Sequence, residues 1–256
     1  MTHVPVSLNH PTRRRALMQV RPTRPLCGLR GWCQPRQLVA HPRGRRELSG
    51  AVNTMAALSE FTGPGGYNDP DLLIGPWCGI DHNQSFCGQS DLQARTQFTL
   101  WALFPAPLLI SQNMLAWSKY ALETYSNEEV IQLNQEPGGV AAVRIAGDDL
   151  VGPPTPCADP EGRFNNCTNV WGRLLTRGNE LAIAFVNNSL AAVEVHCDVA
   201  CFNEIPQRPG TKLSAKGYRV RDLWSHTWLP STNGLNLSAT VAGQGGQRLF
   251  RLVPLS

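Results

Sequence analysis

The first 46 residues of this 256-residue chain contain no aspartate and no glutamate. They hold ten of the chain's 23 basic residues and six prolines without a sustained helix or strand period, so we predict a disordered basic segment over residues 1–46. The other 13 basic residues are outnumbered by 19 acidic ones, which gives residues 47–256 a net charge of −6 within a whole-chain charge of +4. The chain is therefore divided into two regions of opposite charge.

Three interpretations of the basic segment remain open: an arm that binds nucleic acid, an organelle transit peptide, or a mistaken or truncated start of the reading frame. Arginines bind phosphates without sequence preference, but Trp32 is the only aromatic residue among them. We favour the mistaken start and expect no nucleic-acid partner.

Long apolar runs and metal-binding spacings are also missing. The longest apolar candidate, Phe98 to Ile110, is interrupted by Pro105 and Pro107, and Met1 to Val20 lacks the apolar core of a signal peptide. We therefore expect no association with a membrane. The sequence has no C-x2-C pair and its six histidines are scattered, so we expect no metal site.

The cysteines and the glycosylation sequons indicate an oxidising compartment. Eight cysteines form four close pairs, namely Cys27 with Cys33, Cys78 with Cys87, Cys157 with Cys167, and Cys197 with Cys201. Four N-x-S/T sequons begin at Asn83, Asn166, Asn187 and Asn236. We predict disulfides, glycans and a secreted or lysosome-like location, although an intracellular protein with coincidental sequons is an alternative. Disulfide connectivity and oligomeric state cannot be read from the sequence.

Helical and extended patterns alternate between residues 47 and 138. The predicted elements are a helix over Glu47 to Thr62, a helix that opens with a Ser90 to Gln93 capping box and ends near Phe104, a strand buried on both faces over Ala106 to Ile110, a helix over Ser118 to Tyr125, and a helix capped by Asn127 that runs through Leu133. This order indicates part of a parallel α/β fold.

From residue 139 the apolar period changes from that of a helix to that of a strand. The predicted strands are Leu181 to Val186, Val193 to Cys197, Tyr218 to Leu223, Leu235 to Val241 and Arg248 to Val253. We predict a separate antiparallel β-sandwich over residues 139–256.

The segment from Pro64 to Leu73 places two carboxylates, Asp69 and Asp71, on a backbone stiffened by glycine and proline. Gly65 and Gly66 allow a tight turn there. An extended Asp69-Pro70-Asp71 unit would point the two carboxylates in opposite directions, so we expect one to be structural and the other functional.

Several segments together resemble the α-galactosidase/melibiase family of glycoside hydrolases. They are Pro64 to Leu73, Arg95 to Leu103, Ala106 to Ile110, Ser126 to Pro137 and Arg221 to Trp224, and the resemblance covers about residues 48–256. It implies the C-terminal remnant of a (β/α)8 barrel followed by an antiparallel β-sandwich. It also implies an enzyme that cleaves terminal α-D-galactosides with retention through two aspartates and without a cofactor.

The resemblance transfers only part of the site to this chain. Asp71 matches a position that hydrogen-bonds to sugar hydroxyls, Leu72 matches an apolar position beside the sugar, and Asp69 matches a structural position. Tyr67 stands where the family usually has tryptophan, and Glu136 stands where it has aspartate. The nucleophile and the acid/base aspartate of the family lie upstream of Pro64 and have no match, so no catalytic residue is assigned.

We therefore expect a truncated α-galactosidase that is inactive alone. One alternative is a non-enzymatic β-sandwich that binds sugar or has a structural role. Another is a relative of α-N-acetylgalactosaminidase, which the sequence does not distinguish from α-galactosidase. For an α-galactosidase and for an α-N-acetylgalactosaminidase alike, the expected partner is a galactoside-type carbohydrate.

Overall fold

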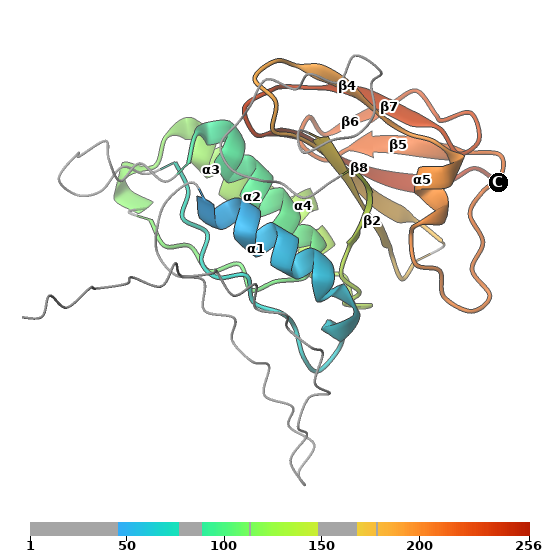
Figure 1. The fold of residues 1–256 in the computed structure, drawn as a ribbon, viewed down its shortest axis with the longest axis horizontal. Helices are drawn as coiled ribbons and strands as arrows, with labels where there is room; N and C mark the ends of the chain where they lie inside the picture. The colour runs from blue at the N-terminus through green and yellow to red at the C-terminus, as the bar shows by residue number, and fades with distance from the viewer. Residues whose placement is uncertain (1–45, 77–88, 113, 148–167, 178) are drawn as a thin grey trace, which may run out of the picture. The chain divides into compact units, whose positions relative to one another are not determined.

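The computed structural model describes residues 46–76, 89–112, 114–147, 168–177 and 179–256, all of which belong to one compact unit (Figure 1). Helices come first along the chain, and antiparallel strands follow from residue 143. The division into domains over residues 47–138 and 139–256 stays a prediction, since the described residues form a single unit. The segment over residues 1–46, in contrast, lies almost entirely outside the described residues.

The helical part begins where the sequence predicts. The described helices are α1 (Arg46–Ala57), η1 (Ser59–Phe61), α2 (Asp91–Leu103), η3 (Met114–Ala116), α3 (Lys119–Tyr125) and α4 (Glu128–Asn134). Ser90, Ser118 and Asn127 each accept a hydrogen bond from the backbone N–H three residues further on, which stabilises the first turns of α2, α3 and α4. The capping box between Ser90 and Gln93 is also present. These helix predictions are confirmed, except that the first helix tightens into a 3-10 turn after Ala57.

The prediction of a doubly buried strand over Ala106 to Ile110 is wrong. Leu109 is 55% exposed and Ile110 is 36% exposed. Ile110 forms only an isolated parallel bridge with Leu73, and no regular strand is assigned to either segment. A segment forms a doubly buried strand only when neighbouring strands pair with it and other elements cover both faces of the sheet. Among the described residues, Leu73 supplies one such neighbour.

The sandwich prediction is confirmed. Its strands are β1 (Val143–Gly147), β2 (Thr168–Leu174), β3 (Leu181–Asn187), β4 (Val193–Cys197), β5 (Tyr218–Asp222), β6 (Thr227–Leu229), β7 (Leu237–Val241) and β8 (Gly246–Pro254), and the short helix α5 (Val199–Asn203) follows β4. One sheet has the order β1-β2-β3-β8-β5-β6 and the other pairs β4 with β7. All named pairs are antiparallel. Sequence patterning missed β1, β2, β6 and α5.

The six-stranded sheet has a hydrophobic layer on each face. Every residue of β3 is buried, because Ile183 and Phe185 face the interior of the sandwich while Ala182 and Ala184 belong to a core shared with the helices. That second core also contains Phe98 and other residues of α2. The helices and the sandwich are therefore joined by one continuous apolar layer, and the small alanines of β3 allow the helices to pack closely.

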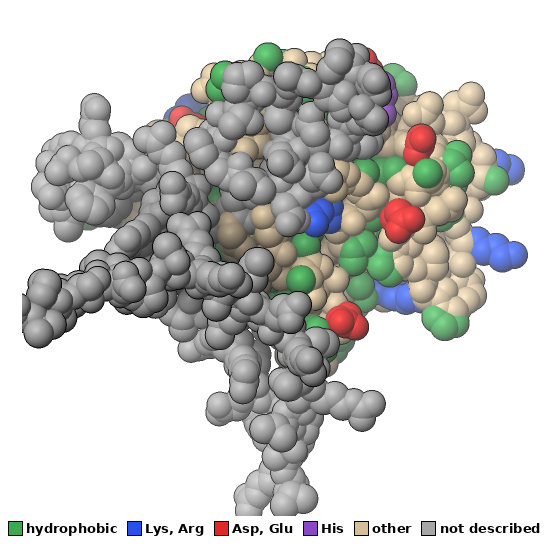
Figure 2. All heavy atoms as spheres, viewed as in Figure 1, with side chains coloured by type: hydrophobic (Ala, Val, Ile, Leu, Met, Phe, Trp, Pro, Cys, Tyr) green, Lys and Arg blue, Asp and Glu red, His purple; other side chains and the backbone are tan. Residues whose placement is uncertain are grey.

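Acidic and basic side chains are scattered singly or in small groups over the described part of the face drawn in Figure 2, with apolar side chains between them. This part of the surface therefore shows no extended basic patch. Within the described ranges, no helix is long and apolar enough to cross a membrane. In the same part of the chain, no three His, Cys, Asp or Glu side chains gather closely enough to hold a metal ion.

Candidate functional site

The candidate site lies on residues 62–76, which follow η1, and a tight turn forms its beginning. Gly63 and Gly66 exchange two backbone hydrogen bonds of 3.0 Å around Pro64 and Gly65. Gly65 has a φ of 98°, and proline followed by a glycine of positive φ is the pattern of a type II turn. This turn directs the chain toward the two aspartates.

Asp69 and Asp71 form a local hydrogen-bonded unit. The backbone N–H of Asp71 donates to Asp69 Oδ1 at 2.9 Å, and the backbone N–H of Leu72 donates to Asp71 Oδ1 at 2.8 Å. Asp71 has a φ of 79°, in the left-handed region that aspartate tolerates better than most residues. The expectation of an extended unit is therefore wrong at Asp71, because the Asp69 carboxylate turns the backbone there.

Two buried side chains of α2 hold the backbone of this loop. Gln97 Oε1 accepts from the N–H of Ile74 at 3.2 Å, and Gln97 Nε2 donates to the carbonyl of Leu72 at 3.1 Å. Trp101 Nε1 donates to the carbonyl of Asp71 at 2.7 Å. Gln97 and Trp101 are four residues apart, so they lie on the same face of the helix.

The opposite edge of the loop is paired as well. The N–H of Leu73 donates to the carbonyl of Leu109 at 2.8 Å, and the N–H of Ser111 donates to the carbonyl of Leu73 at 2.9 Å. The segments around Leu73 and Ile110, which α2 connects, thus lie parallel to each other. Neighbouring strands of a βα barrel are arranged in the same way. Asp71 and Leu72, by contrast, have exposed side chains. The site combines a fixed backbone with accessible side chains.

Gly75, at the end of the hydrogen-bonded part of the loop, lies close to the side chain of Gln112. Its φ is 62°, and a Cβ at this position would collide with the side-chain amide of Gln112. Any side chain would therefore displace Gln112.

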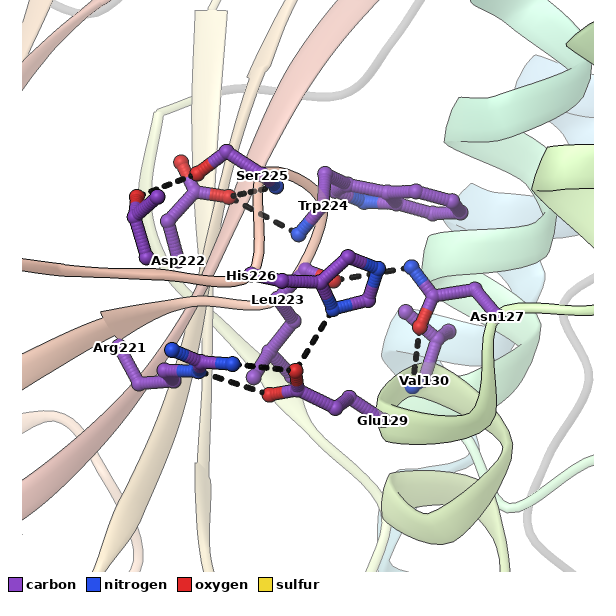
Figure 3. A network of polar contacts seen from close by, with 10 residues as sticks. Asn127, Glu129, Val130, Arg221, Asp222, Leu223, Trp224, Ser225 and His226 are labelled. Atoms are coloured by element: carbon purple, nitrogen blue, oxygen red, sulfur yellow. Dashed lines mark hydrogen bonds and ion pairs between the residues drawn. The ribbon is translucent and has the colours of Figure 1, made fainter.

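A second polar network joins α4 to the hairpin of β5 and β6 (Figure 3). Arg221 donates two hydrogen bonds, of 3.0 and 2.7 Å, to the carboxylate of Glu129, and His226 Nδ1 lies 2.6 Å from Glu129 Oε1. The hydrogen bond from Arg221 is the largest cause of the lowered pKa of Glu129, and the contact with His226 lowers it further against an opposing effect of burial. This carboxyl group is held in its charged form.

Asn127 connects the same two elements through its amide. Its Oδ1 accepts from the N–H of Val130 at 3.1 Å, while its Nδ2 donates to the carbonyl of Leu223 at 2.9 Å (Figure 3). Both ends of one buried side chain are therefore used, one to cap α4 and the other to hold the sandwich.

Asp222 fixes the turn that carries this network. One of its carboxylate oxygens accepts from the N–H groups of Trp224 and Ser225, at 2.9 and 3.0 Å (Figure 3). The other oxygen pairs with Arg248, whose closest nitrogen is 2.6 Å away. The carboxylate therefore has a structural role in the hairpin.

Arg173 of β2 makes a third connection between strands and helices. Its Nη1 donates to the carbonyls of Ala102 and Leu133, at 3.3 and 3.2 Å, near the C-terminal ends of α2 and α4. Its Nη2 pairs with Glu136 at 3.1 Å. Burial is the largest influence on the pKa of Glu136 and raises it, but hydrogen bonds with Thr176 and the charge of Arg173 together lower it. A cation is also favourable at helix C-terminal ends.

Several residues singled out in the sequence lie outside the described residues. They are Cys27, Cys33, Cys78, Cys87, Cys157, Cys167, Asn83 and Asn166. The pair Cys197 and Cys201 lies within them and forms a disulfide.

The two described sequons differ in accessibility. Asn187 is fully buried, and its Nδ2 donates to the carbonyls of Ala191 and Val241 while its Oδ1 accepts from Ser189. A glycan would replace one of the two N–H groups of this nitrogen, so glycosylation at Asn187 would cost at least one of these donated hydrogen bonds. Asn236, in contrast, is exposed just before β7.

The sequence predictions named the side chains of the loop but missed its supports. Gln97 and Trp101 make long-range hydrogen bonds to the backbone carbonyls of Leu72 and Asp71. The available signal was the burial of polar residues within apolar faces, because a buried polar group requires a partner.

These observations define a class of protein in which the end of a parallel βα barrel packs against an antiparallel β-sandwich. Residues 49–136 match a family described as alpha galactosidase A, and residues 165–250 match the alpha galactosidase C-terminal beta sandwich domain. The chain belongs to the α-galactosidase/melibiase family of glycoside hydrolases and corresponds to its C-terminal portion.

The relatives agree with this assignment. Alpha-galactosidase 3 of Arabidopsis thaliana is 32% identical over 167 residues, which are 65% of this chain and 31% of the relative. The alpha-N-acetylgalactosaminidase of Gallus gallus is 39% identical over 88 residues, which are 34% of this chain and 20% of the relative. A structure of the α-galactosidase from Saccharomyces cerevisiae with raffinose has a TM-score of 0.60 at 20% identity, covering 81% of this chain and 51% of that one, and so shows likeness of fold. The chain spans about a third of the length of the curated relatives that it matches.

Proposed function

We propose that this chain provides the last βα units and the C-terminal sandwich of a retaining α-galactosidase, an enzyme acting on terminal α-D-galactosides. In this proposal Asp71 hydrogen-bonds to sugar hydroxyls and Leu72 packs beside the ring. The observation that carries the proposal is the exposure of both side chains on a backbone that is hydrogen-bonded along both edges. A rigid backbone with accessible polar and apolar groups suits a sugar site.

We further propose that residues 1–256 do not hydrolyse galactosides by themselves. A retaining glycosidase needs two carboxyl groups about 5 Å apart, one of them with a raised pKa so that it can act as the acid. In the described part of the chain, the pKa values of Glu129 and Glu136 are lowered, which is the opposite of what a general acid needs. Both groups are also paired with arginine. Residues 1–46 add no acidic side chain.

The test is an assay of the purified chain with a chromogenic α-galactoside beside an intact family member as the positive control. We expect no turnover above the buffer rate. Turnover that is lost in the Asp71→Ala variant would show that the chain is a complete enzyme. Binding is measured separately, from the backbone amide NMR signals of Asp71 and Leu72 during titration with methyl α-D-galactoside. Methyl α-D-glucoside, which differs at one hydroxyl, is the control sugar.

A second specificity has its own support, because one matched relative is an alpha-N-acetylgalactosaminidase. Titration with methyl N-acetyl-α-D-galactosaminide under the same conditions distinguishes the two. Stronger shifts with the acetylated sugar would favour this alternative. The other alternative is a non-enzymatic sandwich, for which sugar-dependent shifts would lie on the β-strands instead of at Asp71.

We also propose that the chain passes through an oxidising, secretory or lysosome-like compartment. The disulfide between Cys197 and Cys201 supports this location, since disulfides persist where thiols are not kept reduced. Mass spectrometry of the chain from secreting cells, before and after enzymatic deglycosylation, tests it. Among the described residues the expected glycan is on the exposed Asn236, and Asn83 and Asn166 are candidates outside them. A protein recovered with reduced cysteines and no glycan would contradict the proposal.

A further inference from the structure

Gln97 and Trp101 are buried in α2, with 3% and 1% of their surfaces exposed, yet their polar atoms reach the backbone from which Asp71 and Leu72 project. We propose that Gln97 and Trp101 are positioning residues that set the affinity of this loop for a galactoside. The inference rests on the proposed function, because it concerns the same sugar contact. It adds two residues that do not themselves touch the sugar.

The first step of the argument is the match between the Gln97 amide and a strand edge. In an extended chain, residues 72 and 74 point their backbone groups to one side and residue 73 points its groups to the other. Gln97 offers one acceptor and one donor, and these pair with the N–H of Ile74 and the carbonyl of Leu72. The amide thus takes the place of a neighbouring strand, while the groups of Leu73 pair with Leu109 and Ser111 on the other side.

The second step concerns Asp71, whose φ of 79° is sparsely populated by residues other than glycine. Such a conformation persists where the surroundings fix it. Trp101 Nε1 bonds directly to the carbonyl of Asp71, and Gln97 bonds to the carbonyl of the next residue. Two side chains on one rigid helix therefore hold the residue that is proposed to contact sugar.

The third step separates positioning from packing. A packing role depends on the volumes of the two side chains, whereas a positioning role depends on their hydrogen bonds. Trp101→Phe keeps an aromatic ring and removes the indole N–H, and Gln97→Met keeps most of the volume and removes both polar atoms. Trp224→Phe is the matched control, because the Trp224 indole donates its hydrogen bond to a side chain of the same helix, Thr99, at 3.1 Å.

The experiment uses the full 256-residue chain, labelled with ¹⁵N and titrated with methyl α-D-galactoside. We expect Trp101→Phe and Gln97→Met each to weaken binding about threefold to tenfold, as the loss of one or two ordinary hydrogen bonds would. The backbone signals of residues 71–74 should shift in these variants even without sugar. Trp224→Phe should leave both the affinity and these signals unchanged.

The outcomes separate this inference from the function on which it rests. Weaker binding in both loop variants, with cooperative unfolding retained, supports positioning. Equal affinity in all variants overturns positioning and leaves the sugar contact in place. If the backbone NMR signals of the unsubstituted chain do not shift with galactoside, the proposed sugar contact is overturned and the positioning inference fails with it. Loss of affinity in Trp224→Phe to the same extent as in Trp101→Phe also overturns it, because the effect would then be general destabilisation.

Discussion

Arg173 of β2 and Glu136, which lies two residues beyond α4, form an ion pair of 3.1 Å in which the guanidinium is fully buried and the carboxylate is 11% exposed. The same guanidinium bonds to carbonyls at the ends of α2 and α4. One side chain therefore connects the sandwich to two helices of the barrel portion.

Replacing Arg173 with methionine should destabilise the chain strongly. The substitution leaves a carboxylate and two carbonyls without their partner in a dry environment, and breaking a buried pair costs about 3 kcal/mol or more. Urea unfolding followed by circular dichroism measures the change. Arg251→Met is the control, because its ion pair with Glu180 is more exposed and should contribute at most about 1 kcal/mol. Equal losses of unfolding free energy in the two variants would show that the buried ion pair stabilises the chain no more than the exposed one.

Acid should weaken the contacts between the helices and the sandwich through Glu129 and Glu136. Both folded-state pKa values lie below the ordinary value of a glutamate, 4.5, so their contribution to stability is present above that pH and is lost as the pH falls through the lowered values. The melting temperature should therefore decrease below about pH 4.5. Glu129→Gln and Glu136→Gln should each flatten this decrease, while Glu123→Gln, at an exposed position, should not. A decrease of the same steepness in all three variants would contradict the assignment.

The sandwich should not fold cooperatively without its helices. Residues 139–256 alone would expose the apolar face that carries Trp171, Ala184 and Leu249, which belong to the core shared with α2. An exposed apolar face of this kind promotes association. We expect aggregation or a broad thermal transition by calorimetry, and a sharp transition for residues 47–256. A sharp, reversible transition of residues 139–256 would instead support a free-standing β-sandwich module.

The stability of variants at Asp71 should depend on whether the new residue tolerates a left-handed backbone conformation. Asp71→Gly and Asp71→Asn should leave the free energy of unfolding nearly unchanged, whereas Asp71→Val should lower it by about 1–2 kcal/mol, because a β-branched residue is strained at a φ of 79°. Chemical unfolding of the three variants provides the comparison. A valine variant as stable as the glycine variant would mean that the loop relaxes freely.

Much of the fold was accessible from local patterns. The caps Ser90, Ser118 and Asn127 fix where helices begin, because a short polar side chain there satisfies a backbone N–H of the first turn. Alternating residues gave β4 and most of β5, β7 and β8. The buried strand predicted over Ala106 to Ile110 failed, because strand formation depends on neighbours that the segment itself does not specify.

The sequence by itself determined the family and the order of helices before strands, because these follow from motifs and periodicity. The resemblance to the family is what marked Asp71 and Leu72 as candidate sugar contacts. Only the tertiary structure decided what holds those residues. Gln97 and Trp101 act over about 25 to 30 positions of sequence, and Arg173 reaches Ala102 over 71. Such contacts depend on which face of a helix packs against which backbone segment. The packing of the whole apolar layer determines this, and no local sequence pattern specifies it.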